Sequence, residues 1–414
     1  MIERIVGIKK RDGSNARLDK LQSFLREASS DTPDIGALVS ELLSIEGLRH
    51  YPTLDLSPQA RKMRTGDALV HLLSGLTARQ PVFMVIEDVH WVDPTTGEWL
   101  DRFIDRLRTL SVLLILSFRP ELEPRWRRLA HVSELSLGRL ARGEGAVIAK
   151  QIAEGKNLPR EIEDQILAKS EGVPLFIEEL TKVAIESGML VDTGDGYTLS
   201  GRLSALTVPA TLKDSLMARL DRLGSAKELA QTGACIGRVF HHRLIAGVAG
   251  ANGARLAEAL RRLEESELVF REGMPPEATY TFKHALIQNT AYDSLLRTRR
   301  QEIHAKIAAK LESDFPEIAA AEPETLAYHH TVAGSAERAV PYWVKAGQAA
   351  LKRSANPEAI AHLRAGIELI ASLPDSEERL KLEIQLQSAL GVAMMGQRGS
   401  GRQTCVRPCR GPAS

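Results

Sequence analysis

The sequence predicts an α/β beginning, built on a small parallel sheet, that is followed by a mostly α-helical remainder. Two short apolar runs, Pro81–Ile86 and Ser111–Leu116, are rich in β-forming residues, and an amphipathic stretch at Thr95–Leu110 separates them. A strand, a helix and a second strand in this order form a βαβ unit with parallel strands and a right-handed crossover. From Leu137 to Met395, apolar residues recur mainly at the spacing of α-helices.

The first 80 residues are expected to form helices joined by polar connections. Apolar positions recur at helical spacing in Leu18–Leu25 and Ile35–Ile45. Two prolines interrupt this spacing in Tyr51–Pro58, and it resumes at Ala68–Leu76. We therefore expect several helices before the first strand.

The two strands are expected to be buried on both faces. Their apolar runs are continuous rather than alternating, which is typical of strands inside a parallel sheet. We expect Pro81–Glu87 and Ser111–Leu116 to lie side by side or one strand apart, with Thr95–Leu110 covering one face.

Helices dominate the middle of the chain. They are expected at Gly143–Ala153, Pro159–Ser170, Phe176–Ser187, Pro209–Leu223, Ala226–Gly233 and Arg255–Ser266. Two β-type segments, Leu268–Arg271 and Thr279–Phe282, then flank a turn that contains Gly and Pro. Helices followed by a small hairpin are typical of a winged helix domain.

The stretch from Glu324 to Met395 is expected to form helical hairpins. Offsets 0, 4, 16, 20 and 23 of a tetratricopeptide repeat (TPR) carry Trp, Gly, Ala, a large apolar residue and a small residue. The matching residues here are Trp343, Gly347, Ala359, Leu363 and Gly366. The nineteen residues from Gly396 hold four Gly, four Arg and no large aliphatic residue except Val406, so a disordered tail is expected.

Composition excludes several classes of protein. The 54 Lys and Arg nearly balance the 53 Asp and Glu, so the chain is not a polycation built for nucleic acid. Aromatic residues make up only 5%, and three cysteines cannot form a disulfide framework. The charged start resembles no signal peptide, and no apolar run approaches the length of a membrane span. A cytoplasmic protein without membrane contact is therefore expected.

Two adjacent carboxylates at the end of the first strand are the strongest chemical signal. In open α/β sheets, ligands bind outside the carboxyl ends of the strands. One carboxylate there can hold Mg²⁺, and the next can orient or deprotonate a water molecule. In the run VFMVIEDVHWVDPTT, Glu87 is predicted to hold the metal and Asp88 to act on the water molecule. Two solvated carboxylates at the start of a loop are the alternative.

This run resembles the Walker B strand of P-loop ATPases of the signal-transducing STAND branch of the AAA-like class. It is most similar to the predicted ATPase modules found beside class III adenylate or guanylate cyclase domains and in large transcriptional regulators. The resemblance implies a sensor strand in ILSFRPE, whose Arg119 would lie near the terminal phosphate. It also implies a lid motif in EGVPLFIEEL, where the bend at Gly172 and Pro174 would contact the adenine. The implied cofactors are ATP and Mg²⁺.

One part of the family pattern is missing. The phosphate-binding motif G-x-x-x-x-G-K-S/T occurs nowhere in the 414 residues. In the family it would lie upstream of what is here residue 1, so we expect a partial P-loop domain that lacks its first strand, its P-loop and any cyclase domain before them. Impaired ATP binding and negligible hydrolysis by this chain alone are expected, so we do not expect it to act as an enzyme by itself.

The resemblance divides the chain into five parts. They are a partial nucleotide-binding core at 1–136, a helical lid at 137–206, a winged helix domain at 207–315, TPR-like helices at 316–395 and the tail at 396–414. A regulatory ATPase module of a signalling protein is the first functional hypothesis, with a protein partner on the TPR-like helices and possible self-association. A non-enzymatic interaction scaffold and a winged-helix DNA-binding regulator are the two alternatives.

Overall fold

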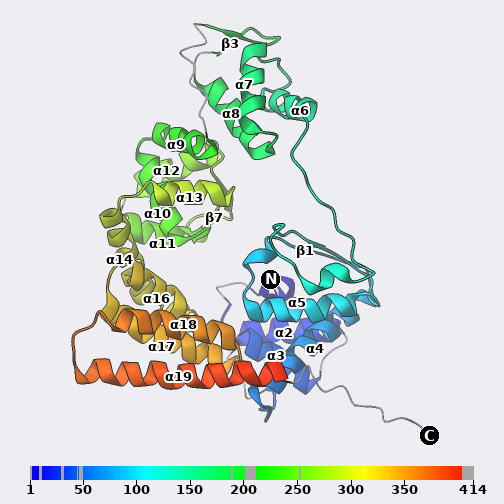
Figure 1. Cartoon of the computed structure of the whole chain (residues 1–414), viewed down its shortest axis with the longest axis vertical. Coiled ribbons are helices and arrows are strands. Elements are labelled where there is room, and N and C mark those ends of the chain that lie inside the picture. The colour runs from blue at the N-terminus through cyan, green and yellow to red at the C-terminus, as the bar shows by residue number, and fades with distance from the viewer. Residues whose placement is uncertain are drawn as a thin grey trace. The chain divides into compact units, whose positions relative to one another are not determined.

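The computed structural model describes residues 2–8, 12–28, 32–43, 45, 50–187, 190–200, 211–250 and 253–402 (Figure 1). The chain forms two compact units. The first contains the described residues of 1–134, 317–331 and 335–414, and the second contains those of 135–316 and 332–334. As expected, a small parallel sheet near the start gives way to a mostly helical chain.

The first unit begins with helices that form their own core. They are α1 (Ile2–Val6), α2 (Ser14–Glu27), α3 (Pro33–Leu42) and α4 (Pro58–Thr77). Leu21, Leu25, Val39 and Leu72 are buried together between α2, α3 and α4. The predicted helical segments are confirmed, but α4 begins ten residues before Ala68, because Pro58 opens the helix and the Ser57 hydroxyl accepts a hydrogen bond from the Ala60 amide at 3.3 Å.

The predicted βαβ unit is present. Strand β1 (Val82–Ile86) pairs in parallel with β2 (Val112–Leu116), and α5 (Pro94–Leu107) joins them. Short 3₁₀ turns follow each strand, at Val89–Trp91 and Arg125–Arg128. Helix α5 buries Leu100, Phe103, Ile104 and Leu107 against one face of the sheet.

The other face of this sheet corrects the prediction of burial on both faces. Phe83 and Leu113 are register partners, and they are 63% and 61% exposed. Val85 and Ile115, the next outward pair, are 48% exposed each. A continuous apolar run predicts a strand whose faces are both suited to burial, but it does not show whether a covering element lies nearby. We call these four side chains the open sheet face.

The second unit starts with three helices and a hairpin. They are α6 (Arg142–Ile152), α7 (Arg160–Ser170), α8 (Pro174–Glu186), β3 (Leu190–Asp192) and β4 (Tyr197–Leu199). The three predicted helices are confirmed. Strands β3 and β4 pair antiparallel, and the sequence analysis missed them although the turn between them contains Asp-Thr-Gly-Asp-Gly.

The rest of the second unit combines helices with a three-stranded antiparallel sheet of order β5-β7-β6. Its elements are α9 (Leu212–Arg222), α10 (Ser225–Ile236), β5 (Val239–His241), α11 (His242–Ala249), α12 (Gly253–Glu265), β6 (Val269–Glu272), β7 (Thr279–Phe282), α13 (Ala285–Asp293) and α14 (Arg297–Asp314). The predicted hairpin is β6–β7. The start of the helix predicted at Pro209–Leu223, residues 209–210, lies outside the described residues.

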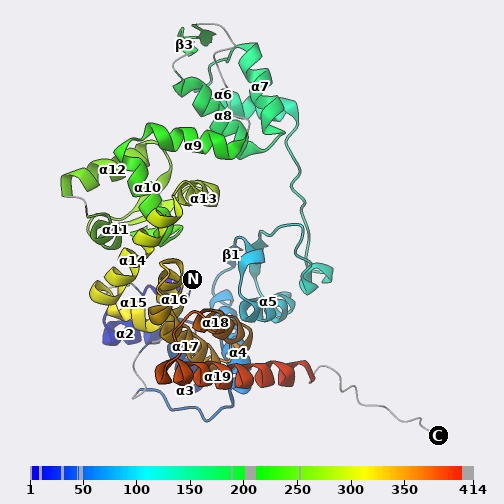
Figure 2. The ribbon, with the colours of Figure 1, turned by 60° about the vertical axis from the view of Figure 1, so that its left-hand side comes forward.

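The first unit also contains the C-terminal helices, drawn in gold to red in Figures 1 and 2. They are α15 (Pro316–Ala321), α16 (Pro323–Val332), α17 (Ala336–Lys352), α18 (Asn356–Ile370) and α19 (Glu377–Arg402). Gly347 lies so close to Leu363 that a Cβ would come within 2.5 Å of its side chain. A Cβ on Gly366 would likewise meet Leu386 at 2.7 Å, so the small residues do permit close crossing of neighbouring helices.

The first part of the predicted tail is helical. Helix α19 continues through Gly396 to Arg402, so the first seven residues of that segment are helical rather than disordered. Residues 403–414 lie outside the described residues.

Candidate functional site

The loops after β1 and β2 meet at the carboxyl edge of the sheet. The Asp88 amide donates to the Ser117 Oγ at 3.0 Å, and the Val89 amide donates to the Ser117 carbonyl at 2.9 Å. The Ser117 amide in turn donates to the carbonyl of Ile86 at 3.1 Å. The two loops that carry Glu87, Asp88 and Arg119 are therefore held together by Ser117, a residue that sequence reasoning had not singled out.

Asp88 occupies an unusual backbone conformation. Its φ of 56° and ψ of 42° lie in the left-handed region, which few residues other than Gly, Asn and Asp adopt. The chain therefore leaves the strand conformation at Asp88, while Glu87 before it is exposed. Two neighbouring carboxylates thus follow the strand, at the edge where the sequence predicts a ligand.

Arg119 lies beside the same loop, in contact with Trp91. Its guanidinium carbon is 5.8 Å from the centroid of the Trp91 ring, within the range of a cation–π contact. Both side chains are exposed, and Trp91 is 60% exposed. The geometry places Arg119 at the same edge as the carboxylates, where a cation could face an anionic ligand.

His90 is a residue of this loop that sequence reasoning left without a role. Neither ring nitrogen has a hydrogen-bond partner among the described residues, and both nitrogens are shielded from solvent. Its ring lies edge-on to Trp91, with the centroids 5.3 Å apart. Buried polar atoms without partners are rare because they forfeit their hydrogen bonds to water. The signal in the sequence was only the position of His90 inside the EDVHW run.

The loop after β1 ends at the first turn of α5, where two carboxylates accept hydrogen bonds. The Asp93 carboxylate accepts a hydrogen bond from the Thr96 amide at 2.8 Å, which makes Asp93 the N-cap of α5. A second carboxylate arrives from α18, because Glu358 accepts from the Thr95 amide at 3.0 Å and from the Thr95 hydroxyl at 2.9 Å. The loop after β1 is therefore joined to the C-terminal helices.

Gly172 and Pro174, the predicted lid residues, belong to the second unit. Gly172 has a φ of +74°, and a Cβ there would lie 2.4 Å from the Leu140 carbonyl oxygen. The Gly172 carbonyl accepts from the Leu140 amide at 2.8 Å, and Pro174 opens α8. These contacts require glycine and favour proline at these positions, whether or not a ligand binds.

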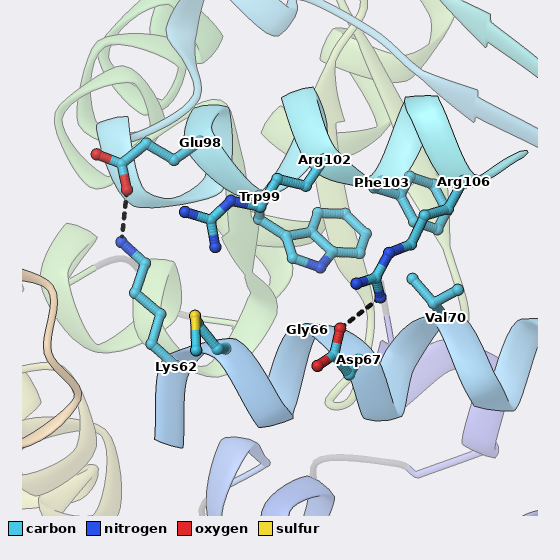
Figure 3. Close-up of a pocket in the computed structure, with 10 residues that line it drawn as sticks. Lys62, Gly66, Asp67, Val70, Glu98, Trp99, Arg102, Phe103 and Arg106 are labelled. Atoms are coloured by element: carbon cyan, nitrogen blue, oxygen red, sulfur yellow. Dashed lines mark hydrogen bonds and ion pairs between the residues drawn. The ribbon is translucent and has the colours of Figure 1, made fainter. Parts of the chain in front are cut away.

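A small groove lies between α4 and α5 (Figure 3). Its cavity has a volume of about 40 Å³, and the Trp99 indole lies over Gly66, where a Cβ would come within 2.9 Å of the ring. The ion pairs Lys62–Glu98 and Asp67–Arg106 lie on either side. Sites for small molecules and cofactors usually measure about 300–1,000 Å³, so this groove cannot hold a nucleotide.

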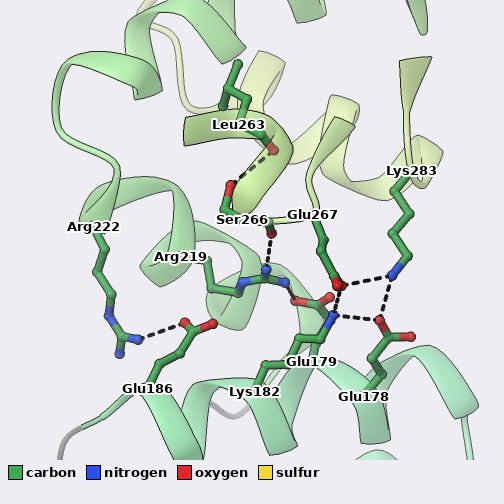
Figure 4. A network of polar contacts seen from close by, with 10 residues as sticks. All are labelled: Glu178, Glu179, Lys182, Glu186, Arg219, Arg222, Leu263, Ser266, Glu267 and Lys283. Atoms are coloured by element: carbon green, nitrogen blue, oxygen red, sulfur yellow. Dashed lines mark hydrogen bonds and ion pairs between the residues drawn. The ribbon is translucent and has the colours of Figure 1, made fainter. Parts of the chain in front are cut away.

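A larger hollow of about 430 Å³ lies in the second unit, lined in part by Glu178, Lys182, Glu267 and Lys283. Figure 4 shows the polar contacts among these four side chains. Burial favours the neutral form of Glu178, but hydrogen bonds from Lys283 and Lys182 lower its pKa to about 2. These charges therefore satisfy one another within the protein.

The same corner contains a buried ion pair. Arg219 of α9 binds Glu179 of α8 and donates a further hydrogen bond to the Ser266 carbonyl. The side chains of Arg219 and Glu179 are only 5% and 2% exposed. Arg222 and Glu186 form a second pair between the same two helices, at 3.4 Å, with both side chains exposed (Figure 4).

Metal-binding and membrane-spanning features were sought throughout the described residues. No group of three or more His, Cys, Asp or Glu side chains in them could hold a metal ion. None of the helices described in the structure has the length and apolar character to cross a bilayer. Glu87 as a single carboxylate still suits Mg²⁺, which is commonly held by one or two carboxylates together with the phosphates of a substrate.

No protein-family model matches the chain, but a curated protein and a solved structure are similar to it. An uncharacterized protein of Rhizobium meliloti is 30% identical over 378 residues, which are 91% of this chain and 36% of that protein. The chain thus spans about a third of the length of the curated relative it matches. A STAND protein with a tetratricopeptide repeat sensor from Pyrococcus horikoshii aligns in structure with a TM-score of 0.49 and 12% identity, over 92% of this chain and 56% of that chain.

Proposed function

We propose that the chain is part of a regulatory ATPase module of the STAND/AAA type, in a signalling protein associated with adenylate cyclase or transcription. The observation that carries this proposal is the edge of the parallel sheet. There, Ser117 ties the loop with Glu87 and Asp88 to the loop with Arg119. Carboxylates and a cation at the carboxyl ends of parallel strands are the groups that phosphoryl-transfer sites use.

Each of these residues has a distinct role in the proposal. Glu87 would hold Mg²⁺, which when bound neutralises charge on the β- and γ-phosphates. Asp88, where the left-handed backbone leaves the strand conformation, would orient a water molecule. Arg119 would face the terminal phosphate, and Trp91 beside it would restrict the guanidinium. For Gly172 and Pro174, contact with the adenine stays a prediction from the resemblance alone.

This chain alone does not supply the phosphate cradle. Backbone amides and a lysine of the G-x-x-x-x-G-K-S/T loop normally bind the phosphates, and that motif is missing from the sequence. Arg119 is exposed, and one exposed charge pair contributes about 1 kcal/mol or less. The two carboxylates would repel ATP that lacks Mg²⁺. We therefore expect no binding of Mg-ATP tighter than about millimolar and no turnover above background.

Calorimetric titration with Mg-ATP tests this proposal in two arms. The chain as given should bind weakly, whereas a chain extended by a strand, a G-x-x-x-x-G-K-S/T loop and a helix should bind and hydrolyse ATP. In the extended chain, Glu87→Gln or Asp88→Asn should abolish turnover, and the exposed control Glu121→Gln should not. Micromolar affinity of the chain as given would contradict the proposed site, as would turnover that survives both carboxylate changes.

A protein-interaction role is the second candidate, and the exposed side of α19 favours it. Four large apolar side chains recur there at helical spacing and are more than half exposed: Leu380, Ile384, Val392 and Met395. A stripe of this kind is the surface on which a further helix, of a partner or of a second copy, could lie.

Sedimentation velocity over a range of protein concentrations tests self-association. The double variant Leu380→Ser/Ile384→Ser should lower the sedimentation coefficient if α19 is the contact, and Phe83→Ser should lower it if the open sheet face is. A protein that stays monomeric at every concentration would contradict self-association through either surface.

DNA binding through residues 207–315 has weaker support. Residues 207–300 hold 14 Lys and Arg against 10 Asp and Glu. On α12, Arg261 and Arg262 both form ion pairs with Glu258, so part of this positive charge is already neutralised. A mobility shift that weakens with salt would be needed to support this function.

A further inference from the structure

Helix α19, drawn in red in Figure 1, has one packed side and one open side. Its packed side contributes Leu386 and Ala393, both fully buried, to the core of the C-terminal helices. On the opposite side, Leu380, Ile384 and Met395 are 59%, 65% and 68% exposed. Because residues three and four positions apart share one side of a helix, these large apolar side chains form a single stripe.

The middle of this stripe contains two small exposed residues, Ser388 and Gly391. A glycine inside a helix lowers the stability of the helix relative to alanine. Packing within the described chain does not require Gly391, because a Cβ there would have no neighbouring atom within 4 Å outside its own stretch of helix. Gly347 and Gly366 differ, since each lies where another helix crosses closely. Gly391 therefore resembles a crossing position that faces outward.

We call Leu380, Ile384, Ser388, Gly391 and Met395 the α19 stripe. The order of large and small residues in its last four members reads the same in both directions. Ile384, Ser388, Gly391 and Met395 follow one another at intervals of four, three and four positions. A surface with this order can be complementary to itself.

Two antiparallel copies of α19 would use this order fully. With the two-fold axis between Ser388 and Gly391, each Ile384 would face the Met395 of the second copy, and each Ser388 would face its Gly391. The small residues at the centre let the two backbones approach, and the large residues pack on either side. A two-fold interface requires the same self-complementary patch on both copies, and the α19 stripe has that property.

The charges along α19 also favour an antiparallel pair. The first turn contains Glu377 and Glu378. From position 384 to position 402 the sequence has no acidic residue, and it has arginines at Arg398 and Arg402. Antiparallel packing therefore brings the acidic end of one helix beside the basic end of the other, and it also opposes the two helix dipoles. A parallel pair would place like charges together.

The twelve residues that follow α19 in the sequence do not suit the α19 stripe. Val406 is their only large aliphatic residue, and two prolines interrupt them. Such a segment cannot cover three exposed apolar side chains that are spread over four turns of helix. The occupant that fits is therefore another molecule.

We propose that the α19 stripe binds the α19 stripe of a second copy of this chain, in an antiparallel pair with two-fold symmetry. The proposal specifies the partner and the geometry for the protein-interaction role given above. It does not rest on the proposed ATPase function, because its tests involve no nucleotide and the Mg-ATP titration involves no residue of α19.

Disulfide cross-linking of the full chain reports the direction of the two helices. A chain with Ile384→Cys is mixed with a chain with Met395→Cys, both in the background Cys405→Ser/Cys409→Ser. Cys235 is buried and should not react. In the antiparallel pair these two positions lie opposite each other, whereas two copies of either position lie eleven residues, or about 16 Å, apart along the helix. A disulfide requires Cα atoms within about 7 Å.

The pattern of cross-links decides between the possible arrangements. We expect cross-linked dimers in the mixture and almost none from either chain alone. Strong cross-links within the Ile384→Cys chain alone would indicate parallel helices and would overturn the proposal. A mixture that forms no cross-link at any protein concentration would overturn it as well.

Gly391→Leu separates association from folding. Its side chain points to open space in the single chain, so the fold should tolerate the change and the thermal melt should not fall. In the dimer the same side chain blocks the close approach of the helices, so the dissociation constant from sedimentation should rise about tenfold or more. Gln385→Leu, an exposed change outside the α19 stripe, is the matched control and should leave the dissociation constant unchanged. A dissociation constant that Gly391→Leu does not raise would overturn the proposal.

Discussion

Two polar contacts in this molecule join segments that are distant in sequence, and they are built in different ways. In the second unit, Arg219 of α9 meets Glu179 of α8, a pair of opposite charges that is almost fully buried. In the first unit, Glu358 of α18 accepts hydrogen bonds from the amide and the hydroxyl of Thr95 in α5. The first contact joins two charges, and the second joins one carboxyl group to neutral donors.

The difference lies in what each contact leaves behind when one partner is removed. Arg219 cannot lose its proton in water, and its hydrogen bond to the Ser266 carbonyl adds a further partner to the contact. Loss of Arg219 leaves the charge of Glu179 buried, whereas loss of Glu358 leaves only the neutral amide and hydroxyl of Thr95 without this acceptor.

The largest effect is expected at the buried ion pair of Arg219 and Glu179. Arg219→Met leaves Glu179 buried without a counter-charge, which should lower the free energy of unfolding of the second unit by about 3–5 kcal/mol. Urea unfolding followed by far-ultraviolet circular dichroism measures the loss. The double variant Glu179→Leu/Arg219→Met should recover most of it, and a double variant as unstable as the single one would show that the charge is not the cause.

A smaller, pH-dependent effect is expected beside that ion pair. The pKa of Glu178 is about 2 in the folded chain against an ordinary value of 4.5, so its stabilising contribution is complete above the ordinary value and disappears as the pH falls toward 2. Glu178→Gln should therefore cost about 1–2 kcal/mol at neutral pH and little near pH 3. Thermal melts of both proteins across this range give the difference, and a cost that grows with acid would contradict the assignment.

The N-cap of α5 should show the same pH trend as Glu178. Asp93→Ala removes this N-cap, which should cost about 1 kcal/mol of stability at neutral pH. Burial raises the pKa of Asp93, but hydrogen bonds outweigh it and bring that pKa below its ordinary value, so the cost should shrink as the pH falls and the carboxylate is protonated. Unfolding curves at acid and neutral pH test this, and a cost that is equal at both would show that the Asp93 carboxylate does not cap the helix in its ionised form.

The smallest effect is expected at the exposed pair between α8 and α9. Arg222 and Glu186 join the same helices as Arg219 and Glu179, but water screens both charges. Arg222→Met should change the free energy of unfolding by no more than about 1 kcal/mol. A loss as large as that of Arg219→Met would mean that burial does not distinguish the two pairs.

The sequence predicted the local elements well because their signals are local. The apolar runs at Pro81–Ile86 and Ser111–Leu116 gave two paired parallel strands, and the helical spacing between them gave α5. Gly347 and Gly366 lie where close helix crossing requires small residues. These local signals could not show whether another element covers each face of the sheet. The prediction that both faces are buried was therefore wrong for the open sheet face.

The candidate site was only partly predictable. The EDVHW run pointed to Glu87 and Asp88, whose proposed roles still await a test. No local pattern indicated that Ser117 would join the two loops or that Glu358 would reach Thr95, since these contacts link residues 29 and 263 positions apart. Such contacts depend on how whole elements are placed, and a local pattern carries no information about that.

The division into two units also determines what can be observed by fluorescence. All four tryptophans of the chain, Trp91, Trp99, Trp126 and Trp343, belong to the first unit. Trp126 is buried and the Trp343 indole donates to the Thr331 hydroxyl, so unfolding of this unit should change the emission strongly. The second unit has no indole and is visible only to circular dichroism. Comparing the two signals during one denaturation therefore reveals, without any label or mutation, whether the units unfold together or in sequence.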